Sequence, residues 1–121
     1  MSTLRIESQD AGRGVTVVRP AGSIDAHTYR QMQEAMARLL ATRASVVVDL
    51  SAVDYVSSMG AGVLIHVHAQ LEARGGGLIV AAVRPTVMET MRVLGLTQVF
   101  AFAPSAAEGV RLLGEATGVI S

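Results

Sequence analysis

The sequence predicts an α/β fold in which a mixed β-sheet is covered by about four helices. Half of the 121 residues are hydrophobic, which is enough for a buried core without disulfides or metals. Compact β-branched runs alternate with segments whose apolar residues recur every three or four positions. This alternation is typical of a sheet covered by helices, and the length fits a single domain over residues 1–121.

The first element is a predicted β-hairpin. Leu4–Ser8 alternates apolar and polar residues, Asp10–Gly14 has the composition of a turn, and Val15–Arg19 is again rich in β-branched residues. We expect Pro20 and Gly22 to end the second strand.

A helix is predicted next, over Tyr29–Leu40, because its apolar residues form a stripe at helical spacing. Asp25 or Thr28 is placed to cap the start of this helix. The run Val46–Leu50 then predicts a strand buried on both faces, and we expect a loop from Ser51 to Ser58.

The second half of the chain repeats the strand and helix pattern. A second helix carries Val63, Leu64, Val67 and Leu71 and stops at Gly75–Gly77. A buried strand over Leu78–Val83 follows, and Pro85 opens a third helix whose inward residues we expect to be Val87, Met88, Met91 and Leu94. A short strand over Val99–Phe102 and a last helix from Pro104 and Ser105 complete the chain, the helix bearing Ala106, Val110 and Leu113.

Composition argues against several classes of function. The chain has no cysteine, and its ten arginines and ten acidic residues are dispersed and leave no net charge, so nucleic acid is not expected as a partner. Met1–Arg5 lacks the apolar core of a signal peptide. The longest uncharged stretch, Tyr55–Leu71, is too short and too polar for a membrane span of about 20 apolar residues. We therefore expect a cytoplasmic protein without membrane insertion.

The stretch from Asp49 to Leu64 is the most informative. A buried strand leads into the two hydroxyls of Ser57 and Ser58, and a helix then begins with small residues. The first backbone N–H groups of a helix lack internal partners and lie at its positive end, so a phosphate on Ser58 would be favoured there. The plainer alternative is that Ser57 or Ser58 is an ordinary N-cap, and spacing alone favours the cap.

Three segments resemble the STAS domain family of anti-sigma factor antagonists. Val53–Leu64, which reads VDYVSSMGAGVL, is similar to the family segment Val-x-Phe-Ile-Asp-Ser-Ser-Gly-Leu-Gly-Val-Leu. Ala21–Thr28 resembles the family turn Gly-x-Leu-Asp-x-x-Thr after the second strand, and Arg84–Leu96 resembles the family's third helix and its exit. The segments occur in the family's order and spacing over most of the chain.

The resemblance implies a function by partner switching. An antagonist of this family binds an anti-sigma factor that is also a serine protein kinase, is released when that kinase phosphorylates it, and is reset by a serine phosphatase. The acceptor falls on Ser58, with Ser57 as second choice. The implied partner-binding residues are Gly22, Asp25, Thr28, Ser57, Met59, Gly60 and Gly62.

Two residues depart from the family pattern. Ser57 stands where the family has Asp, and Met59 stands where it has a second Ser or Thr. The missing acid removes a negative charge beside the acceptor, and Met59 places a flexible apolar chain at a contact surface. The departures leave a second hypothesis open, a STAS scaffold or transport-associated interaction module that is not phosphorylated.

A third hypothesis, a small enzyme or nucleotide-binding domain, finds no catalytic pattern. His66 and His68 are two positions apart on a predicted helix and point about 200° apart, so they cannot share a metal ion. The Gly-x-Ser-x-Gly pattern of hydrolases is absent, and Gly75–Gly77 lacks the Lys-Ser/Thr of a phosphate loop. We expect a non-enzyme without cofactor or metal, present as a monomer or weak homodimer.

Overall fold

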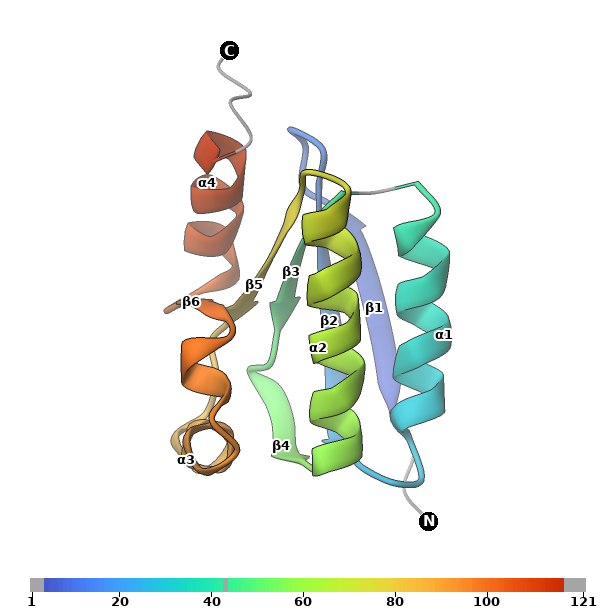
Figure 1. Ribbon diagram of the computed structural model, residues 1–121, viewed down its shortest axis with the longest axis vertical. Coiled ribbons are helices and arrows are strands. Elements are labelled where there is room, and N and C mark those ends of the chain that lie inside the picture. Colours follow the sequence, from blue (N-terminus) through green and yellow to red (C-terminus); the bar gives the residue numbers. More distant parts are fainter. Residues whose placement is uncertain (1–3, 43, 117–121) are drawn as a thin grey trace.

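The computed structural model describes residues 4–42 and 44–116 and contains a mixed sheet with helices (Figure 1). The elements, in chain order, are β1 (Arg5–Asp10), β2 (Val15–Ile24), α1 (Tyr29–Leu40), β3 (Ser45–Asp49), β4 (Ala52–Val56), α2 (Ser58–Ala73), β5 (Gly77–Ala81), α3 (Pro85–Val93), the 3-10 turn η1 (Leu96–Gln98), β6 (Ala101–Ala103) and α4 (Ala106–Ala116). The predicted fold class is confirmed.

Strand β2 organises the sheet, whose order is β1-β2-β3-β5-β6. β1 is antiparallel to β2, and the remaining pairs are parallel. The first half of β2, Val15–Val18, pairs with β3, and its second half, Ala21–Ile24, pairs with β4. β2 therefore pairs first with β3 and then with β4 along the same edge, and β4 lies beside the C-terminal half of β2.

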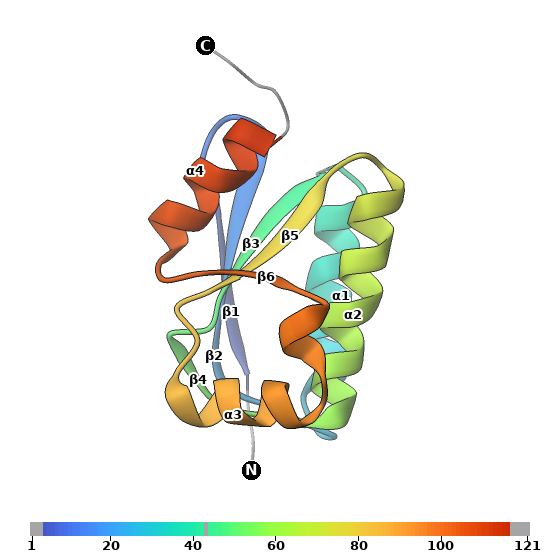
Figure 2. The same ribbon diagram turned by 60° about the vertical axis from the view of Figure 1, so that its left-hand side comes forward.

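The helices lie on both faces of the sheet (Figure 2). α1 and α2 cover one face, α4 covers part of the other, and α3 packs against β4 at one end. The larger core lies under α1 and α2 and includes the fully buried residues Val18, Ile24, Met32, Met36, Leu64 and Leu71. A smaller core under α4 contains Val15, Val17, Val47, Ile79 and Leu113. Across residues 4–42 and 44–116, none of the helices combines the length and hydropathy needed to span a bilayer.

The expectation that Pro20 and Gly22 end the second strand was wrong, because β2 continues to Ile24. Pro20 lies after the residues that pair with β3 and before those that pair with β4. A proline lacks the N–H that a strand donates to a neighbour, and this interval of β2 has a neighbour on the β1 side alone. Pro20 is tolerated in β2 because it lies where the strand changes its pairing from β3 to β4.

The expected loop from Ser51 to Ser58 was also wrong, because Ala52–Val56 forms β4. The buried residues of β4 are Val53 and Val56, three positions apart, which breaks the period-2 pattern of a regular strand. The pairing register shifts between Gly22 and Ser23, whose partners are Val53 and Tyr55. The intervening Asp54 is thus the extra residue of a bulge. Because the bulge interrupts the alternation of buried and exposed residues, the sequence does not show the strand pattern.

Two expectations near the third helix were wrong. Leu94 was expected to face inward but is 41% exposed, and Leu96 in η1 is buried in its place. The last strand was expected over Val99–Phe102 but spans Ala101–Ala103. Gly95 adopts a left-handed conformation after α3, so the chain turns there and Leu96, two positions after Leu94, is the residue that faces inward.

Candidate functional site

Ser57 is the N-cap of α2. Its Oγ accepts a hydrogen bond from the backbone N–H of Gly60 at 3.2 Å, and its carbonyl oxygen accepts the first helical bond, from the N–H of Ala61, at 2.8 Å. The backbone of Ser57 is extended, as a cap requires. The sequence left open which of the two serines caps the helix, and the structure places Ser57 in that role.

Ser58 is the first residue of α2 and is exposed. Within the part of the chain that the structure describes, its hydroxyl has no hydrogen-bond partner, and the first turn of α2 holds no acidic residue. The hydroxyl therefore stands free at the positive end of a 16-residue helix. A dianion attached to it would meet unpaired backbone donors and no opposing side-chain charge in that turn.

The turn that follows β2 is ordered by Asp25 and Thr28. One carboxylate oxygen of Asp25 accepts hydrogen bonds from the N–H groups of His27, at 2.9 Å, and Thr28, at 3.1 Å. The bond from the His27 N–H is the main cause that lowers the pKa of Asp25. Asp25 thus caps the turn before α1, whereas Thr28, the N-cap residue of α1 itself, makes no side-chain cap bond to the helix.

Thr28 is fully buried, and its hydroxyl ties the turn to the end of β2. It donates to the carbonyl oxygen of Ser23 at 2.6 Å and accepts from the N–H of Asp25 at 2.9 Å. Thr28 therefore shapes the turn from inside, and Asp25, which is half-buried, is the residue of the pair that a partner could reach.

Ile24 joins the two predicted parts of the site. Its carbonyl oxygen accepts the N–H of Ser57 at 2.9 Å, and its backbone pairs with Val56 at the end of β4. The segments Gly22–Thr28 and Ser57–Gly62 therefore lie together, as the resemblance implied. Ile24 itself was not among the candidate residues, although its place between Gly22 and Asp25 in the first motif marked the position.

The three glycines of the site serve different purposes. A Cβ at Gly60 would lie 2.4 Å from the carbonyl oxygen of Ile24, so α2 can approach β2 this closely because Gly60 has no side chain. Gly62 is exposed and has open space around its Cβ position. Gly22 has a φ of 120° beside the β4 bulge, a conformation that L side chains rarely adopt.

Large apolar side chains flank the two serines. Tyr55 is 51% exposed and Met59 is 45% exposed, so both side chains are accessible to a partner. Beside them, the hydroxyl of Ser23 donates to the carboxylate of Asp54 at 2.8 Å and links β2 to the bulge. Tyr55 and Asp54 were missed as site residues, because the sequence placed them in a loop. We call the exposed residues Tyr55, Ser58, Met59 and Gly62, with the Asp25 turn, the Ser58 surface.

The two histidines of α2 have separate surroundings. His66 is exposed and contacts the amide nitrogen of Gln70 at 3.3 Å, whereas His68 lies 3.3 Å from a carboxylate oxygen of Glu72 and packs edge-on against Phe100. Residues 4–42 and 44–116 hold no group of three histidines, cysteines or acids that could ligate a metal ion.

Comparison with known proteins matches the family model described as "STAS domain" to residues 9–109. The chain belongs to the STAS domain family. A curated relative of this STAS domain is an anti-sigma F factor antagonist from Paenibacillus polymyxa, 31% identical over 91 residues, which cover 72% of this chain and 76% of the relative. The resemblance found in the sequence is confirmed.

Solved structures agree with the STAS assignment. An anti-sigma factor antagonist from Mycobacterium paratuberculosis superimposes with a TM-score of 0.82 at 26% identity, over 92% of this chain and 94% of the other. The Bacillus cell fate determinant SpoIIAA in its phosphorylated form has the same fold, with a TM-score of 0.70 at 18% identity over 88% and 97% of the two chains.

Proposed function

We propose that this STAS protein is a cytoplasmic anti-sigma factor antagonist that works by binding and not by catalysis. Its partner is an anti-sigma factor that is also a serine kinase, phosphorylation of Ser58 by that kinase releases it, and a serine phosphatase restores the free hydroxyl. The similarity to two proteins named as anti-sigma factor antagonists supports the proposal. The existence of a phosphorylated form of SpoIIAA, which shares the fold, supports the chemistry.

The proposal rests on the different structural roles of Ser57 and Ser58. Ser57 is committed to capping, since its Oγ accepts the N–H of Gly60. Ser58 is exposed at the first position of α2. A kinase needs a hydroxyl that it can surround, and Ser58 offers one without breaking the helix start.

The release mechanism is electrostatic. A phosphoryl group adds roughly −1.5 to −2 charge at neutral pH. In the free protein the group stays hydrated at the positive end of α2. In a complex packed against Tyr55 and Met59, the same charge would lose its hydration beside apolar side chains. Because burying an unpaired charge costs several kcal/mol, we expect the binding free energy to weaken by roughly that amount.

The partner-binding residues divide by exposure. Met59 and Gly62 are exposed and Asp25 is half-buried, so these three contact the partner directly in our proposal, together with Ser57 and Ser58. The remaining candidates, Gly22, Thr28 and Gly60, act by holding the shape of the Ser58 surface, since Thr28 and Gly60 are buried and Gly22 lies at the strand bulge.

The test uses Ser58→Ala and Ser58→Asp with the cognate anti-sigma kinase. We expect Ser58→Ala to bind the kinase but to take up no phosphate from ATP, and Ser58→Asp to bind at least tenfold more weakly, since about 1.4 kcal/mol corresponds to tenfold. Ser105→Asp is the matched control, because Ser105 caps the start of α4 through a bond from the N–H of Glu108. Phosphate found by mass spectrometry on Ser57 instead, or unchanged binding by both Ser58 variants, would contradict the proposal.

The second candidate function is a STAS scaffold or transport-associated module that is not phosphorylated. The departures at Ser57 and Met59 favour it. The same experiment separates the two, because a phosphopeptide spanning both serines excludes the scaffold.

A further inference from the structure

Strand β1 forms an open edge of the sheet. Its register with β2 is regular over all six residues, without a bulge, and β1 contains no proline. The N–H of Ala11 donates to the carbonyl of Val15 in the same register, at 2.9 Å, whereas the N–H of Leu4 turns away from β2 to the side chain of Gln31, at 3.3 Å. Bonded and unbonded positions alternate in an antiparallel pair, so Ile6 and Ser8 direct their backbone groups outward. Such an edge is a template for another strand.

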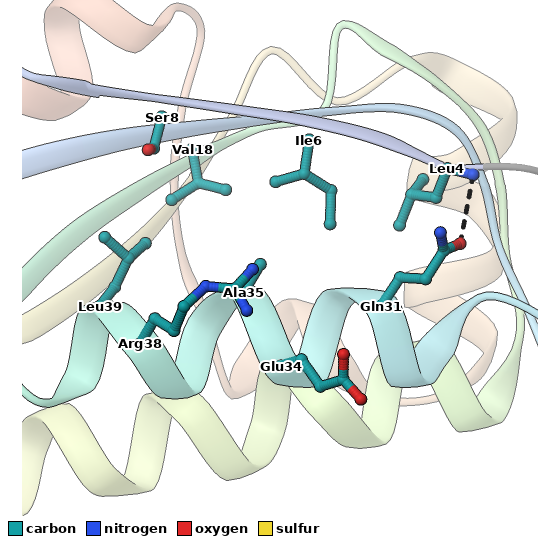
Figure 3. Close-up of a pocket in the computed structure, with 9 residues that line it drawn as sticks. All are labelled: Leu4, Ile6, Ser8, Val18, Gln31, Glu34, Ala35, Arg38 and Leu39. Atoms are coloured by element: carbon teal, nitrogen blue, oxygen red, sulfur yellow. Dashed lines mark hydrogen bonds between the residues drawn. The ribbon is translucent and has the colours of Figure 1, made fainter.

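A slot of about 400 Å³ runs between β1 and α1 beside this edge (Figure 3). Its apolar lining comes from Leu4, Ile6, Val18, Ala35 and Leu39. Glu34 and Arg38 of α1 border the slot, and Glu34 also interacts electrostatically with Arg30 of the same helix. The slot therefore combines apolar walls with two opposite charges on one helix.

We propose that a second copy of this chain occupies the edge and the slot, pairing β1 with β1 in antiparallel fashion about a two-fold axis at Ile6. This register pairs Ile6 with Ile6 of the copy on the slot side, where both side chains bury each other. On the opposite face of the sheet it sets Arg5 against Glu7 of the copy, twice by symmetry. Opposite charges at directly facing positions stabilise an antiparallel pair.

The neighbouring registers fit less well. An axis at Glu7 sets the two Glu7 carboxylates against each other and leaves Arg5 opposite the uncharged Gln9 of the copy. An axis at Ser8 faces Asp10 with the apolar Ile6. All three registers use the outward backbone groups of the even-numbered residues, but among them the Ile6 register alone sets Arg5 against Glu7.

The same axis brings the two α1 helices together. It stands perpendicular to the sheet, so both helices lie on one face and run antiparallel across the axis. Reversal of the order sets Glu34 of one copy toward Arg38 of the other, again twice, so that opposite charges face each other across the axis. The interface is isologous, as in most two-fold dimers.

The dimer does not depend on the proposed function. Ser58 lies on α2, and no residue of α2 lines the slot. The contact is small, five residues of strand and one flank of a helix, and small interfaces are typical of weak association. We expect association that rises with concentration, unaffected by Ser58→Asp.

The first experiment exploits the absence of cysteine. Sedimentation equilibrium over a wide concentration series should show the mass rising from 12.6 kDa toward twice that value. Ile6→Cys should form a disulfide-linked dimer on mild oxidation, because facing residues of a hydrogen-bonded antiparallel pair have Cα atoms about 5.5 Å apart, within disulfide range. Ser8→Cys is the control, since in this register Ser8 faces Leu4 of the copy. A mass fixed at 12.6 kDa, or a dimer linked through Ser8→Cys but not Ile6→Cys, overturns the proposal.

The second experiment reverses one charge. Arg5 and Glu7 are exposed, so substitutions there preserve the fold, which circular dichroism checks. Arg5→Glu places like charges opposite each other twice and should raise the dimer dissociation constant about tenfold. The double variant Arg5→Glu/Glu7→Arg restores both opposite pairs and should restore association. If Arg5→Glu has the same dimer dissociation constant as the parent, the Ile6 register is wrong. If the double variant does not regain the parent's dissociation constant, the pairing of Arg5 with Glu7 is wrong.

Discussion

Gly60 and Gly62 provide a matched pair for testing how α2 is seated on the sheet. A Cβ at Gly60 would lie 2.4 Å from the carbonyl oxygen of Ile24 and 2.7 Å from its Cγ2, so α2 must retreat by about 1 Å to reach an ordinary contact of 3.5 Å or more. Ile24 is fully buried and cannot move aside. The same carbonyl holds the N–H of Ser57 at 2.9 Å, so the retreat also strains the cap.

The magnitude follows from three contributions. Forced overpacking costs about 1–3 kcal/mol, a weakened backbone hydrogen bond costs about 1 kcal/mol, and replacing glycine by alanine in a helix returns about 0.5–1 kcal/mol. Gly60→Ala should therefore lower the free energy of unfolding by about 1–3 kcal/mol. Gly62→Ala meets nothing within 4 Å and should raise it by about 0.5–1 kcal/mol.

Urea denaturation followed by circular dichroism measures both variants. Their midpoints should move in opposite directions, with an unchanged slope against denaturant, since neither substitution alters the surface exposed on unfolding. If Gly60→Ala is as stable as Gly62→Ala, the close seating of α2 on Ile24 is wrong, and the argument that Gly60 holds the Ser58 surface in shape fails with it.

Three further predictions concern the same end of the molecule. Ser57→Ala removes the N-cap of α2 and should lower the free energy of unfolding by about 1 kcal/mol, measured in urea, whereas Ser57→Asp keeps an acceptor and should lower it far less. Asp25→Asn should be less stable than the parent at neutral pH, because the folded-state pKa of Asp25 is lowered; that difference should vanish as pH falls below about 4, through the unfolded and then the folded pKa, in urea titrations at each pH. Met59→Ala should leave thermal stability within about 0.5 kcal/mol of the parent, since Met59 is 45% exposed, yet weaken binding to the proposed anti-sigma partner in calorimetry.

The regular elements of this fold were predictable, and the irregular ones were not. Val46–Val48 is recognisable from its composition, because its residues are buried on both faces of the sheet, and α1 is recognisable from its spacing, because one side of the helix faces the larger core. β4 depends on a bulge at Asp54 and on a long β2 that exchanges partners after Val18. Those features exist through pairing between distant segments, and no local pattern in Ala52–Val56 encodes them.

The position of the candidate site could be predicted from the sequence, but the structural roles of its individual residues could not. The two motifs around Asp25 and Ser58 meet through Ile24, as the family resemblance implied. The sequence could not show which of Ser57 and Ser58 caps the helix and which keeps a free hydroxyl. That depends on which of the two residues adopts the extended backbone before α2. Nor could it show that Thr28 is buried, since its hydroxyl turns inward to a carbonyl that lies five positions earlier.

The replacement of the family's aspartate by Ser57 now has a physical explanation. The N-cap position needs a short side chain with an acceptor oxygen, and serine and aspartate serve about equally well there. Serine therefore keeps the helix start intact while it removes a negative charge from the position beside Ser58. A phosphoryl group on Ser58 would then meet the field of α2 without a neighbouring carboxylate on the cap to oppose it. The substitution preserves the structure that presents Ser58, so the departure from the family pattern is compatible with phosphorylation at that residue.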